Sequence, residues 1–314
     1  MAGCSPGFEE VRTFDPVQRC WFLTGPTASG KTAVGLELAA RIGAEIISVD
    51  SMAVYLGMDV GTAKPTLAER QSIPHHLIDI VTPDTEFSLS QYVALAHETV
   101  AEIRARNRQV LFVGGTPLYL KSLLRGVYPG PPADWAFRRQ IEEELGRVGV
   151  QALHERLRQM DPLSAARLHP NDKRRIVRAL EVYKVTGIPL SHQQTHFETP
   201  RSDACNRVMT FRWPRAHLHQ RIETRVVRMF EAGLVGEVRK LLEKYGRLGR
   251  TAAQAVGYRE VADHLRGKRD LEATVERVTT RTRQFARRQE TWFRSLSECE
   301  WLEISDAETP GDIA

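Results

Sequence analysis

The eight residues from Gly25 to Thr32 constrain the fold of this chain most strongly. They read Gly-Pro-Thr-Ala-Ser-Gly-Lys-Thr, which fits the phosphate-binding pattern G-x-x-x-x-G-K-[ST]. In such a loop, backbone N–H groups surround phosphate oxygens, the lysine neutralises them, and the Ser or Thr hydroxyl binds Mg²⁺. An apolar run at 19–24 precedes the loop, and apolar residues at helical spacing follow it as far as Gly43. This context predicts a strand, a phosphate-binding loop and a helix.

Two further segments predict strands of the same sheet. Residues 44–51 read as a buried strand that ends at Asp50, and residues 109–116 read as another that ends in Gly-Gly-Thr. A helical pattern from about Ser90 to Arg106 precedes the second of them. Strands that alternate with helices form parallel sheets. We therefore predict an α/β fold with a parallel sheet like that of P-loop NTPases, flanked by helices.

Three polar side chains are expected to meet at one edge of this sheet. Lys31, Asp50 and Thr116 each lie just past the carboxyl end of a predicted strand, where ligands bind in open parallel sheets. An ATPase usually also has an Mg²⁺-binding Asp after an apolar strand, and Asp79 stays a candidate for that role. Asp50 could bind Mg²⁺, act as a base or cap the next turn. The motif alone predicts a phosphate ligand and leaves the reaction open.

A Pro/Gly-rich break at 128–134 predicts a domain boundary. Residues beyond it, as far as 186, have the composition of helices, and a strand at 207–212 precedes several basic helices at 215–296. We predict three segments: the first part of the core at 19–132, a helical insertion domain at 133–205, and the second part of the core at 206–303.

The positive charge of the chain is concentrated in one segment. Residues 1–199 are balanced, residues 200–294 carry a net charge of +11, and residues 295–314 contain acids and no bases. Such a field attracts polyanions and favours a nucleic-acid partner, although solvated helix faces would give the same composition.

Several protein classes are excluded or disfavoured. No run of 18 apolar residues could span a membrane, and the first 20 residues do not look like a secretory signal. Four scattered cysteines suggest reduced thiols rather than disulfides or a zinc site. We expect a cytoplasmic protein that needs no membrane.

Seven motifs stand in order along roughly residues 19–303. They read GPTASGKT, DSMAVYLGMDVGTAKPT, IPHHLIDIV, VGGTPLYLKSLL, NDKRRIVRALEVYKVTG, AVGYRE and TRQFARRQETWFR. Together they resemble the tRNA dimethylallyltransferases, the isopentenyl transferases of tRNA, and this resemblance implies that the helical insertion domain at 133–205 is involved in tRNA binding. Eukaryotic members of that family often carry a C-terminal zinc finger, which this sequence lacks, so we expect a bacterial-type enzyme.

The resemblance implies a reaction. A dimethylallyl group would pass from dimethylallyl diphosphate to the exocyclic N6 of the adenosine 3′-adjacent to the anticodon, in tRNAs that read codons beginning with U, and diphosphate would leave. Mg²⁺ is the implied cofactor, the tRNA anticodon stem-loop is the implied partner, and we expect a monomer.

The resemblance also implies roles for individual residues. The implied diphosphate-binding residues are Gly25, Thr27, Ala28, Ser29, Gly30, Lys31 and Thr32. Thr32 is also the implied metal ligand. Asp50 matches the family's general base, Arg225 an arginine that reaches the diphosphate, and Thr116 a threonine that lines the channel. By pattern alone, Thr116 could equally cap a helix, and Arg225 could belong to a solvated basic face.

The implied tRNA contacts are Ser51, Met52, Ala53, Arg138, Arg174, Arg175, Ile176, Val177, Arg178, Gln254, Gly257, Tyr258, Arg259, Thr282, Arg283, Gln284, Arg287, Arg288 and Gln289. The last of these stretches lies on a predicted helix with an apolar stripe at Val275, Val278, Thr282, Phe285, Gln289, Trp292 and Leu296. Thr282 and Gln289 interrupt that stripe with polar side chains. They either border a substrate channel or are buried groups with satisfied hydrogen bonds.

Two residues depart from the family pattern. Ala53 stands where the family usually has Gln, and Pro117 stands where it usually has Gly. These departures concern the contact with the adenine and the shape of the channel mouth.

Three other functions remain as alternatives to the tRNA enzyme. An adenylate isopentenyltransferase would share the loop and the base but would not need the basic segment. A small-molecule kinase would use the loop for ATP. An RNA-binding protein without catalysis would not need the loop beside Asp50.

Overall fold

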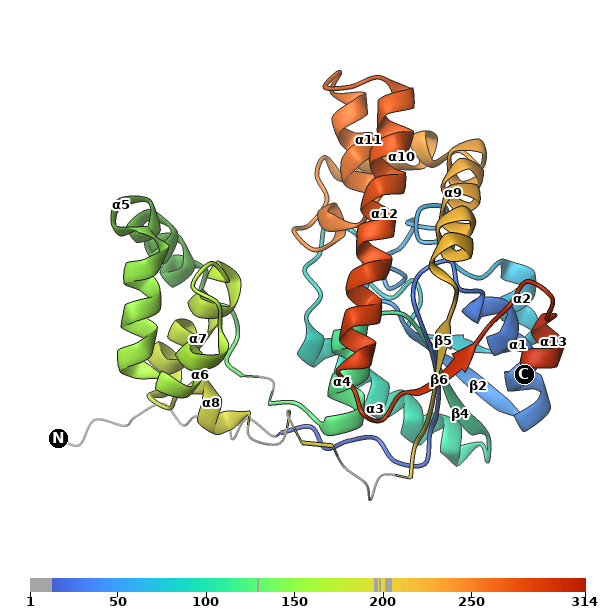
Figure 1. Cartoon of the computed structure of the whole chain (residues 1–314), viewed down its shortest axis with the longest axis horizontal. Coiled ribbons are helices and arrows are strands. Elements are labelled where there is room, and N and C mark those ends of the chain that lie inside the picture. The colour runs from blue at the N-terminus through green and yellow to red at the C-terminus, as the bar shows by residue number, and fades with distance from the viewer. Residues whose placement is uncertain (1–12, 129, 195–196, 198, 201–204) are drawn as a thin grey trace. The chain divides into compact units, whose positions relative to one another are not determined.

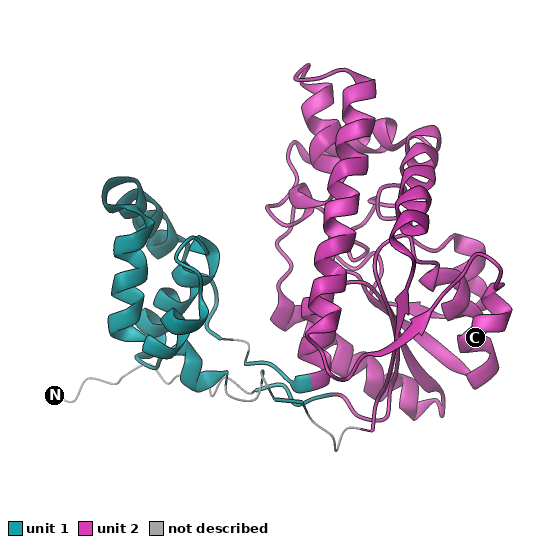
Figure 2. Cartoon of the chain, viewed as in Figure 1, with its two compact units in different colours: residues 1–16, 125–200 teal, residues 17–124, 201–314 magenta. Residues whose placement is uncertain are grey.

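A computed structural model describes residues 13–314 apart from 129, 195–196, 198 and 201–204. The chain divides into two compact units (Figures 1 and 2). The larger unit comprises residues 17–124 and 201–314, and the helical unit comprises residues 1–16 and 125–200. The second segment of the helical unit runs from Arg125 to Pro200, and the insertion predicted from the sequence runs from 133 to 205.

The larger unit is built on a six-stranded sheet with the order β3-β2-β4-β1-β5-β6. Every pairing in this sheet is parallel. The strands are β1 (Trp21–Thr24), β2 (Ala44–Val49), β3 (His75–His76), β4 (Gln109–Gly114), β5 (Arg207–Arg212) and β6 (Glu300–Glu303). The predicted parallel α/β sheet is confirmed.

Helices cover both faces of this sheet (Figure 1). Those of the larger unit are α1 (Lys31–Ile42), α2 (Leu67–Ser72), α3 (Leu89–Ala105), α4 (Pro117–Arg125), α9 (Arg215–Glu231), α10 (Leu234–Tyr245), the short 3₁₀ helix η3 (Ala252–Gln254), α11 (Tyr258–Leu265), α12 (Leu271–Arg294) and α13 (Pro310–Ile313). Leu23 and Leu111 join one buried cluster with side chains of α1, α9 and α12. Because adjacent strand residues alternate in direction, Phe22 and Phe112 point to the opposite face, where their rings stack. The helix α3 contacts β2 and β4 without joining the first cluster, and so covers that opposite face.

The two strands that the sequence did not predict lie at the ends of the sheet. The β3 strand has only two residues, which pair with Ile46 and Ile47. The β6 strand pairs with β5, and its exposed glutamates, Glu300 and Glu303, flank the half-buried Trp301 and Leu302 without the alternation typical of a strand. Both are held by the neighbouring strand rather than by a strong pattern of their own.

The helical unit has its own small core. Its helices are α5 (Trp135–Met160), α6 (Pro162–Arg167), α7 (Lys173–Thr186) and α8 (Leu190–Gln193). The α5 helix is interrupted at Gly149, whose φ of 80° and ψ of 169° are not helical. Side chains from α5, α6 and α7 form the core, and among them Leu157 and Ile176 are fully buried.

The buried stripe of α12 differs in part from the prediction. Val278, Thr282 and Gln289 are buried as predicted, but Ala286 and Phe293 complete the stripe. Phe285, predicted to belong to it, is 36% exposed. After Thr282 the buried stripe continues at Ala286, four residues later, whereas the predicted stripe continued at Phe285, three residues later. Both spacings suit a helix with 3.6 residues per turn.

Candidate active site

The phosphate-binding motif forms a tight loop between β1 and α1. Gly30 precedes the helix with a φ of 89°, and Gly25 has a φ of 146°. A Cβ atom built on Gly25 would lie 3.0 Å from the Cβ of Phe211. Both positions therefore favour glycine because of their backbone conformation. At Gly25, the close packing against Phe211 is a second reason.

Hydrogen bonds on the outside of the loop turn its N–H groups inward. The Ala28 carbonyl accepts from Arg221 Nε at 2.9 Å, and the Ser29 carbonyl accepts from Trp213 Nε1 at 3.1 Å. In a trans peptide the N–H points away from the preceding C=O, so the N–H groups of Ser29 and Gly30 point to the other side of the chain. Both residues line the same cavity, which makes the loop a cradle for an anion.

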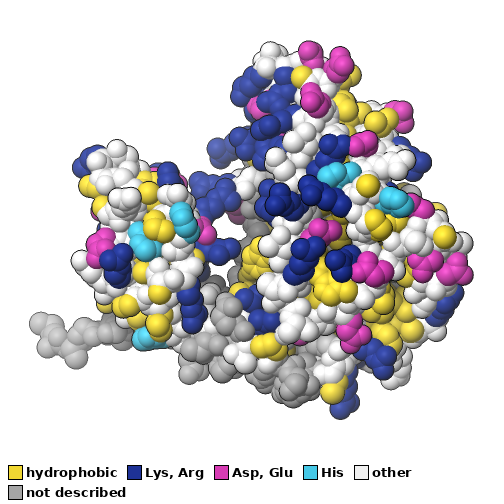
Figure 3. Space-filling view, viewed as in Figure 1, with side chains coloured by type: hydrophobic (Ala, Val, Ile, Leu, Met, Phe, Trp, Pro, Cys, Tyr) yellow, Lys and Arg dark blue, Asp and Glu magenta, His cyan; other side chains and the backbone are white. Residues whose placement is uncertain are grey.

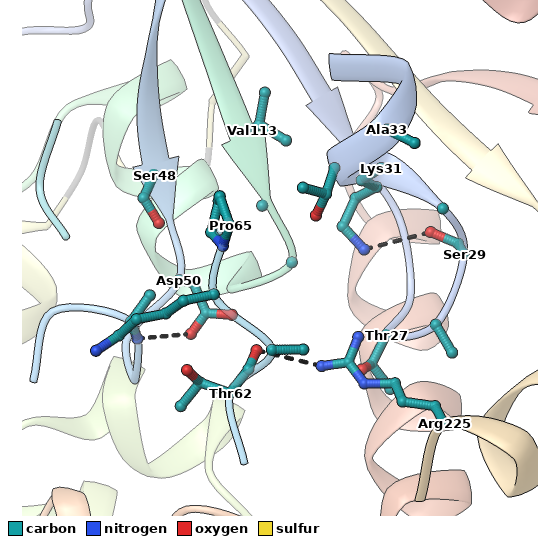
Figure 4. Close-up of a pocket in the computed structure, with 18 of the residues that line it drawn as sticks. Thr27, Ser29, Lys31, Ala33, Ser48, Asp50, Thr62, Pro65, Val113 and Arg225 are labelled. Atoms are coloured by element: carbon teal, nitrogen blue, oxygen red, sulfur yellow. Dashed lines mark hydrogen bonds between the residues drawn. The ribbon is translucent and has the colours of Figure 1, made fainter. Parts of the chain in front are cut away.

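Lys31 lies at the start of α1 and reaches back over the loop. Its Nζ donates to the Pro26 carbonyl at 2.6 Å and to Ser29 Oγ at 3.3 Å (Figure 4). Burial and the nearby Arg225 lower the pKa of Lys31 to about 7, and Asp50 opposes this shift. The site therefore disfavours a second positive charge until an anion enters.

Arg225 comes from α9 and lines the same cavity. Its Nη2 donates to the Thr62 carbonyl at 3.2 Å (Figure 4). Burial lowers the pKa of Arg225 from its usual value, and the Asp50 carboxylate partly offsets the effect. A guanidinium has further donors in a planar fork, so it can bind a phosphate while it keeps this bond.

Asp50 follows β2 and has the capping role, one of the three that the sequence left open. Its Oδ1 accepts from the Met52 N–H at 2.8 Å and the Ala53 N–H at 3.3 Å, which caps the following turn. Among the described residues its Oδ2 makes no hydrogen bond, and Asp50 lines the cavity. The carboxylate is thus fixed by one oxygen and keeps the other for chemistry.

Thr116 has a different position from the one expected. Its Oγ1 accepts from the Ser51 N–H at 3.0 Å and lies 3.4 Å from Ser51 Oγ. It is absent from the described residues that line the cavity. In this structure Thr116 fixes the chain next to Asp50 instead of lining a channel.

A loop between β2 and α2, residues 59–66, forms another wall of the cavity. Glu237 of α10 anchors it, because its carboxylate accepts from the N–H groups of Asp59, Val60 and Gly61 at 3.0, 2.8 and 3.3 Å. The hydroxyl of the buried Tyr258 donates to the same carboxylate. No pattern in the sequence pointed to Glu237.

Asp79, the candidate metal ligand, lines the same cavity but is already paired there with two bases. It pairs with Lys64 at 2.5 Å and with Arg70 at 2.7 Å. Burial raises the pKa of Asp79, but the hydrogen bonds from Lys64 and Arg70 outweigh this effect and hold the pKa below its ordinary value. Two strong partners make Asp79 a structural ion pair and a poor metal ligand.

The cavity has a volume of about 1220 Å³. It joins the loop, Asp50, Arg225 and, from α12, Phe285 and Gln289. Residues Thr27 to Thr32 all line it, as does Ala53, whereas Gly25 supports the loop from outside. The structure thus brings Lys31 and Asp50 together, as their positions after the strands predicted, and adds Arg225 rather than Thr116 to them (Figure 4).

The residues expected to contact tRNA fall into exposed and buried groups. Those exposed are Arg174, Arg175, Gln254, Arg259, Gln284, Arg287 and Arg288. Those buried are Ala53, Ile176, Gly257, Tyr258, Thr282 and Gln289. Those between, partly exposed, are Ser51, Met52, Arg138, Val177, Arg178 and Arg283. In Figure 3, Lys and Arg side chains gather along the part of the larger unit that contains α12.

Several of these side chains have structural partners, which argues against the predicted direct contact. Ile176 is in the core of the helical unit with no exposed surface, and Tyr258 is equally buried. The Thr282 hydroxyl donates to the Val278 carbonyl one turn earlier, so this polar gap in the stripe is satisfied within the helix. Arg138 makes a two-point ion pair with the fully buried Glu181.

The two departures from the family pattern are accommodated locally. Pro117 is the first residue of α4, where proline is favoured because its missing N–H would have no partner in the helix. Ala53 forms part of the cavity wall with 5% of its surface exposed.

A magnesium ion bound in this cavity would need ligands from the residues that line it. The described residues contain no group of three His, Cys, Asp or Glu side chains that could hold a metal ion by themselves. Thr32 and Asp50 do line the same cavity as the loop. Mg²⁺ commonly binds through one or two protein oxygens together with substrate phosphates and water, so these residues fit an ion that arrives with a diphosphate.

Within the described residues, no helix combines the length and apolar character needed to cross a membrane.

Comparisons with known proteins identify relatives across most of the chain. The family model described as IPP transferase matches residues 53–296. A tRNA dimethylallyltransferase of Rhodopirellula baltica is 50% identical over 299 residues, which are 93% of this chain and 90% of that protein. One of Geobacter metallireducens is 46% identical over 286 residues, which are 91% of this chain and 92% of that protein.

Solved structures agree. A tRNA isopentenylpyrophosphate transferase from Bacillus halodurans has 37% identity and a TM-score of 0.67, and the match covers 94% of each chain. A eukaryotic dimethylallyltransferase acting on tRNA has 27% identity and a TM-score of 0.76, over 92% of this chain and 75% of that one. The family model and the relatives together show that the chain belongs to the IPP transferase family.

Proposed function

We propose that this enzyme transfers a dimethylallyl group from dimethylallyl diphosphate to the exocyclic N6 of the adenosine 3′-adjacent to the anticodon, in tRNAs that read codons beginning with U. One observation carries the proposal. A phosphate cradle and a carboxylate, Asp50, line the same cavity, and that carboxylate has one oxygen fixed by backbone N–H groups. An anion would be held on one side, and a proton could be accepted on the other.

The cradle is suited to a leaving diphosphate. When the C–O bond of dimethylallyl diphosphate breaks, negative charge grows on the diphosphate and positive charge on the allyl carbon. The N–H groups of Ser29 and Gly30, the Lys31 ammonium and the Arg225 guanidinium would stabilise the anion. Donors fixed in advance need not reorganise during the reaction, which is why such sites accelerate bond cleavage.

Mg²⁺ is proposed as the cofactor; the Thr32 hydroxyl would hold it together with oxygens of the diphosphate, and Asp50 lines the same cavity. When bound, the ion would neutralise part of the charge on the leaving group. Lys31 and Arg225 would carry the rest of this role from the protein side.

Asp50 is proposed as the general base. The adenine amino group is a weak nucleophile because its lone pair is delocalised into the ring. As N6 forms its bond to the allyl carbon, it must lose a proton, and the Asp50 carboxylate would accept it. Because Met52 and Ala53 hold Oδ1, the free Oδ2 would be the oxygen that accepts the proton. The new C–N bond, the broken C–O bond and the transferred proton balance the reaction.

A tRNA acceptor is supported by the basic segment and by the names of the relatives. The curated relatives are tRNA dimethylallyltransferases, and one structural neighbour acts on tRNA. Arg287 and Arg288 are exposed on α12, the helix that also lines the cavity through Phe285 and Gln289. Phosphate contacts on such a surface would offset the few kcal/mol needed to flip an adenine out of its stack.

The test is a transfer assay with two acceptors and a third reaction that measures ATP turnover. Purified enzyme, Mg²⁺ and dimethylallyl diphosphate are incubated with undermodified tRNA or with AMP, and a third reaction contains tRNA and ATP without the prenyl donor. Nucleoside mass spectrometry should find prenylated adenosine in the tRNA reaction alone. Product from AMP alone would indicate an adenylate isopentenyltransferase, and ATP turnover without prenylation would indicate a kinase or an ATPase.

A further inference from the structure

Gln289 lies on the helix expected to contact tRNA, but its side chain points into the protein. Only 3% of its surface is exposed, whereas its neighbours Arg287 and Arg288 are exposed. Its Oε1 accepts a hydrogen bond from the Thr27 N–H at 2.8 Å, and its Nε2 donates to the Gly115 carbonyl. Both ends of the amide are therefore occupied by backbone groups of the sheet's carboxyl edge.

The bond to Thr27 sets the orientation of the first peptide in the cradle. Because this peptide is trans, the Pro26 carbonyl points away from Gln289 when the Thr27 N–H points toward it. That carbonyl is the 2.6 Å acceptor of the Lys31 ammonium. Gln289 thus fixes the group on which the lysine rests before an anion arrives.

This bond also changes the expected donor set of the cradle. The Thr27 N–H, predicted to face the diphosphate, is committed to Gln289. The N–H groups of Ser29 and Gly30 keep their inward orientation, because their preceding carbonyls are held by Trp213 and Arg221. Side chains of α9 and α12, together with Trp213, which lies two residues before the start of α9, therefore hold the loop.

Gly115 provides the space that Gln289 occupies. A Cβ atom at Gly115 would lie 2.7 Å from Nε2 of Gln289, 3.1 Å from the Gly25 carbonyl oxygen and 3.7 Å from Nζ of Lys31. The Gly115 N–H donates to the Val49 carbonyl at 3.1 Å, directly before Asp50. A single amide thus links the phosphate loop to the ends of β4 and β2.

We propose that Gln289 is a positioning residue of the diphosphate site, which holds the Pro26–Thr27 peptide and through it the resting position of Lys31, and that it does not contact tRNA. The inference rests on the proposed function, since it names the residue that shapes the site for the prenyl donor. A residue that contacts RNA would act on tRNA affinity, whereas this one acts on diphosphate affinity.

The experiment compares Gln289→Met, which removes both hydrogen bonds at similar side-chain volume, with two variants of the same helix. Binding of inorganic diphosphate with Mg²⁺ is measured by calorimetry, and tRNA binding is measured at several salt concentrations. Gln289→Met should weaken diphosphate binding and raise the KM for dimethylallyl diphosphate at least about tenfold, with a smaller change in kcat. Its tRNA affinity and salt dependence should match those of the wild type.

The two control variants of α12 should behave differently from Gln289→Met: one should affect tRNA binding alone, and the other should affect neither ligand. Arg288→Ala should lower tRNA affinity and leave diphosphate binding unchanged. Thr291→Ala removes an exposed hydroxyl whose one hydrogen bond within the described part of the chain is to the Arg287 carbonyl, and should change neither. A Gln289→Met variant with normal diphosphate affinity, or with weakened tRNA binding as its main defect, would overturn the proposal.

A double-variant cycle provides a second test that does not depend on one substitution. Gly115→Ala should weaken diphosphate binding because its methyl group displaces Gln289. In the Gln289→Ala background, the same glycine substitution should cost less, since the contact at 2.7 Å is gone and only the 3.1 Å approach to the Gly25 carbonyl remains. Multiplicative effects of the two changes would mean that Gly115 and Gln289 act independently, and would contradict the proposal.

These results separate the inference from the proposed function. If the wild type binds diphosphate and Gln289→Met weakens that binding, but no prenylated adenosine forms, the reaction is misassigned and the positioning role stands. If prenylation occurs and Gln289→Met leaves diphosphate affinity unchanged, the positioning role is wrong and the proposed function stands.

Discussion

The carbonyl oxygen of Thr62 lies 3.2 Å from Nη2 of Arg225 and accepts its hydrogen bond. The loop that carries Thr62 is itself held by Glu237, which accepts from three consecutive N–H groups immediately before it. Glu237 therefore fixes the direction of an arginine that it does not touch.

Glu237→Gln should weaken the donor site. In the wild type, both carboxylate oxygens of Glu237 accept hydrogen bonds from N–H groups of the loop. In the variant, the amide NH₂ would take the place of one oxygen and face N–H donors, so the loop would shift. Arg225 would then lose its hydrogen bond to the Thr62 carbonyl. We expect the KM for dimethylallyl diphosphate to rise by about tenfold, which corresponds to the loss of about one or two hydrogen bonds. Steady-state kinetics measures this, with Glu243→Gln on the exposed face of the same helix as the control. Equal KM values for the two variants would remove Glu237 from this role.

Asp50→Asn should stop turnover while the site stays formed. The asparagine Oδ1 can still accept from the Met52 and Ala53 N–H groups, but the side chain can no longer accept a proton. Single-turnover rates should fall by about 10²- to 10⁴-fold, the usual contribution of a general base. Diphosphate binding should be equal or tighter, because a negative charge near Lys31 and Arg225 has been removed. A near-normal rate in this variant would exclude Asp50 as the base.

Binding of diphosphate should take up a proton at Lys31. The pKa of Lys31 is lowered to about 7 without ligand, and a bound anion would raise it toward its ordinary value. At pH values between these two pKa values, Lys31 is deprotonated in the free enzyme and protonated in the complex. The affinity for diphosphate should therefore fall as the pH rises above about 7. Calorimetry in buffers of different ionisation enthalpy measures the proton uptake. In Lys31→Arg, which stays charged, this uptake should disappear, and its persistence would point to another group.

Arg287 and Arg288 should contribute to RNA affinity through charge. Both are exposed, and neither forms an ion pair with any described residue. Each alanine variant should weaken tRNA binding and reduce the slope of log affinity against log salt by about one unit. Filter binding across a salt series measures the slope. A slope equal to that of the wild type would return the substituted arginine to an ordinary solvated surface.

Arg138→Ala should chiefly destabilise the helical unit. Glu181 has no exposed surface and is held by Arg138 and Arg178, so the substitution leaves a buried carboxylate with one fewer partner. We expect a loss of about 2 kcal/mol, less than for a pair broken completely because Arg178 remains. Hydrogen exchange of the α7 amides measures it, with the exposed Arg175→Ala as the control. Unchanged exchange in Arg138→Ala, together with weakened tRNA binding, would favour an RNA contact instead.

The sequence was sufficient for the parts of the fold with strong local signals. The loop from Gly25 to Thr32, the helix that follows it and the position of Asp50 after β2 all came from regular patterns, and the structure places them as predicted. The β3 and β6 strands were not predicted, because pairing with a neighbouring strand holds them and periodicity does not reveal such pairing.

The side-chain contacts within the site were harder to predict. Glu237 lies 178 residues after Asp59, and Gln289 lies 262 residues after Thr27, so only the folded chain brings each pair together. The pattern marked Gln289 as polar within an apolar stripe, but it could not say which backbone groups satisfy it. Direct tRNA contacts were predicted for Ile176 and Tyr258 from their motifs, yet burial places both side chains in the interior.

The most direct test of the account maps the modified nucleotide. Two anticodon stem-loop RNAs, with adenosine or guanosine 3′-adjacent to the anticodon, are incubated with enzyme, Mg²⁺ and dimethylallyl diphosphate. The products are then cut into fragments for mass spectrometry, and released diphosphate is counted. The account predicts a dimethylallyl mass gain in the fragment that holds this adenosine, one diphosphate for each modification, and no reaction with the guanosine RNA. Modification at another nucleotide, or diphosphate release without prenylated adenosine, would contradict it.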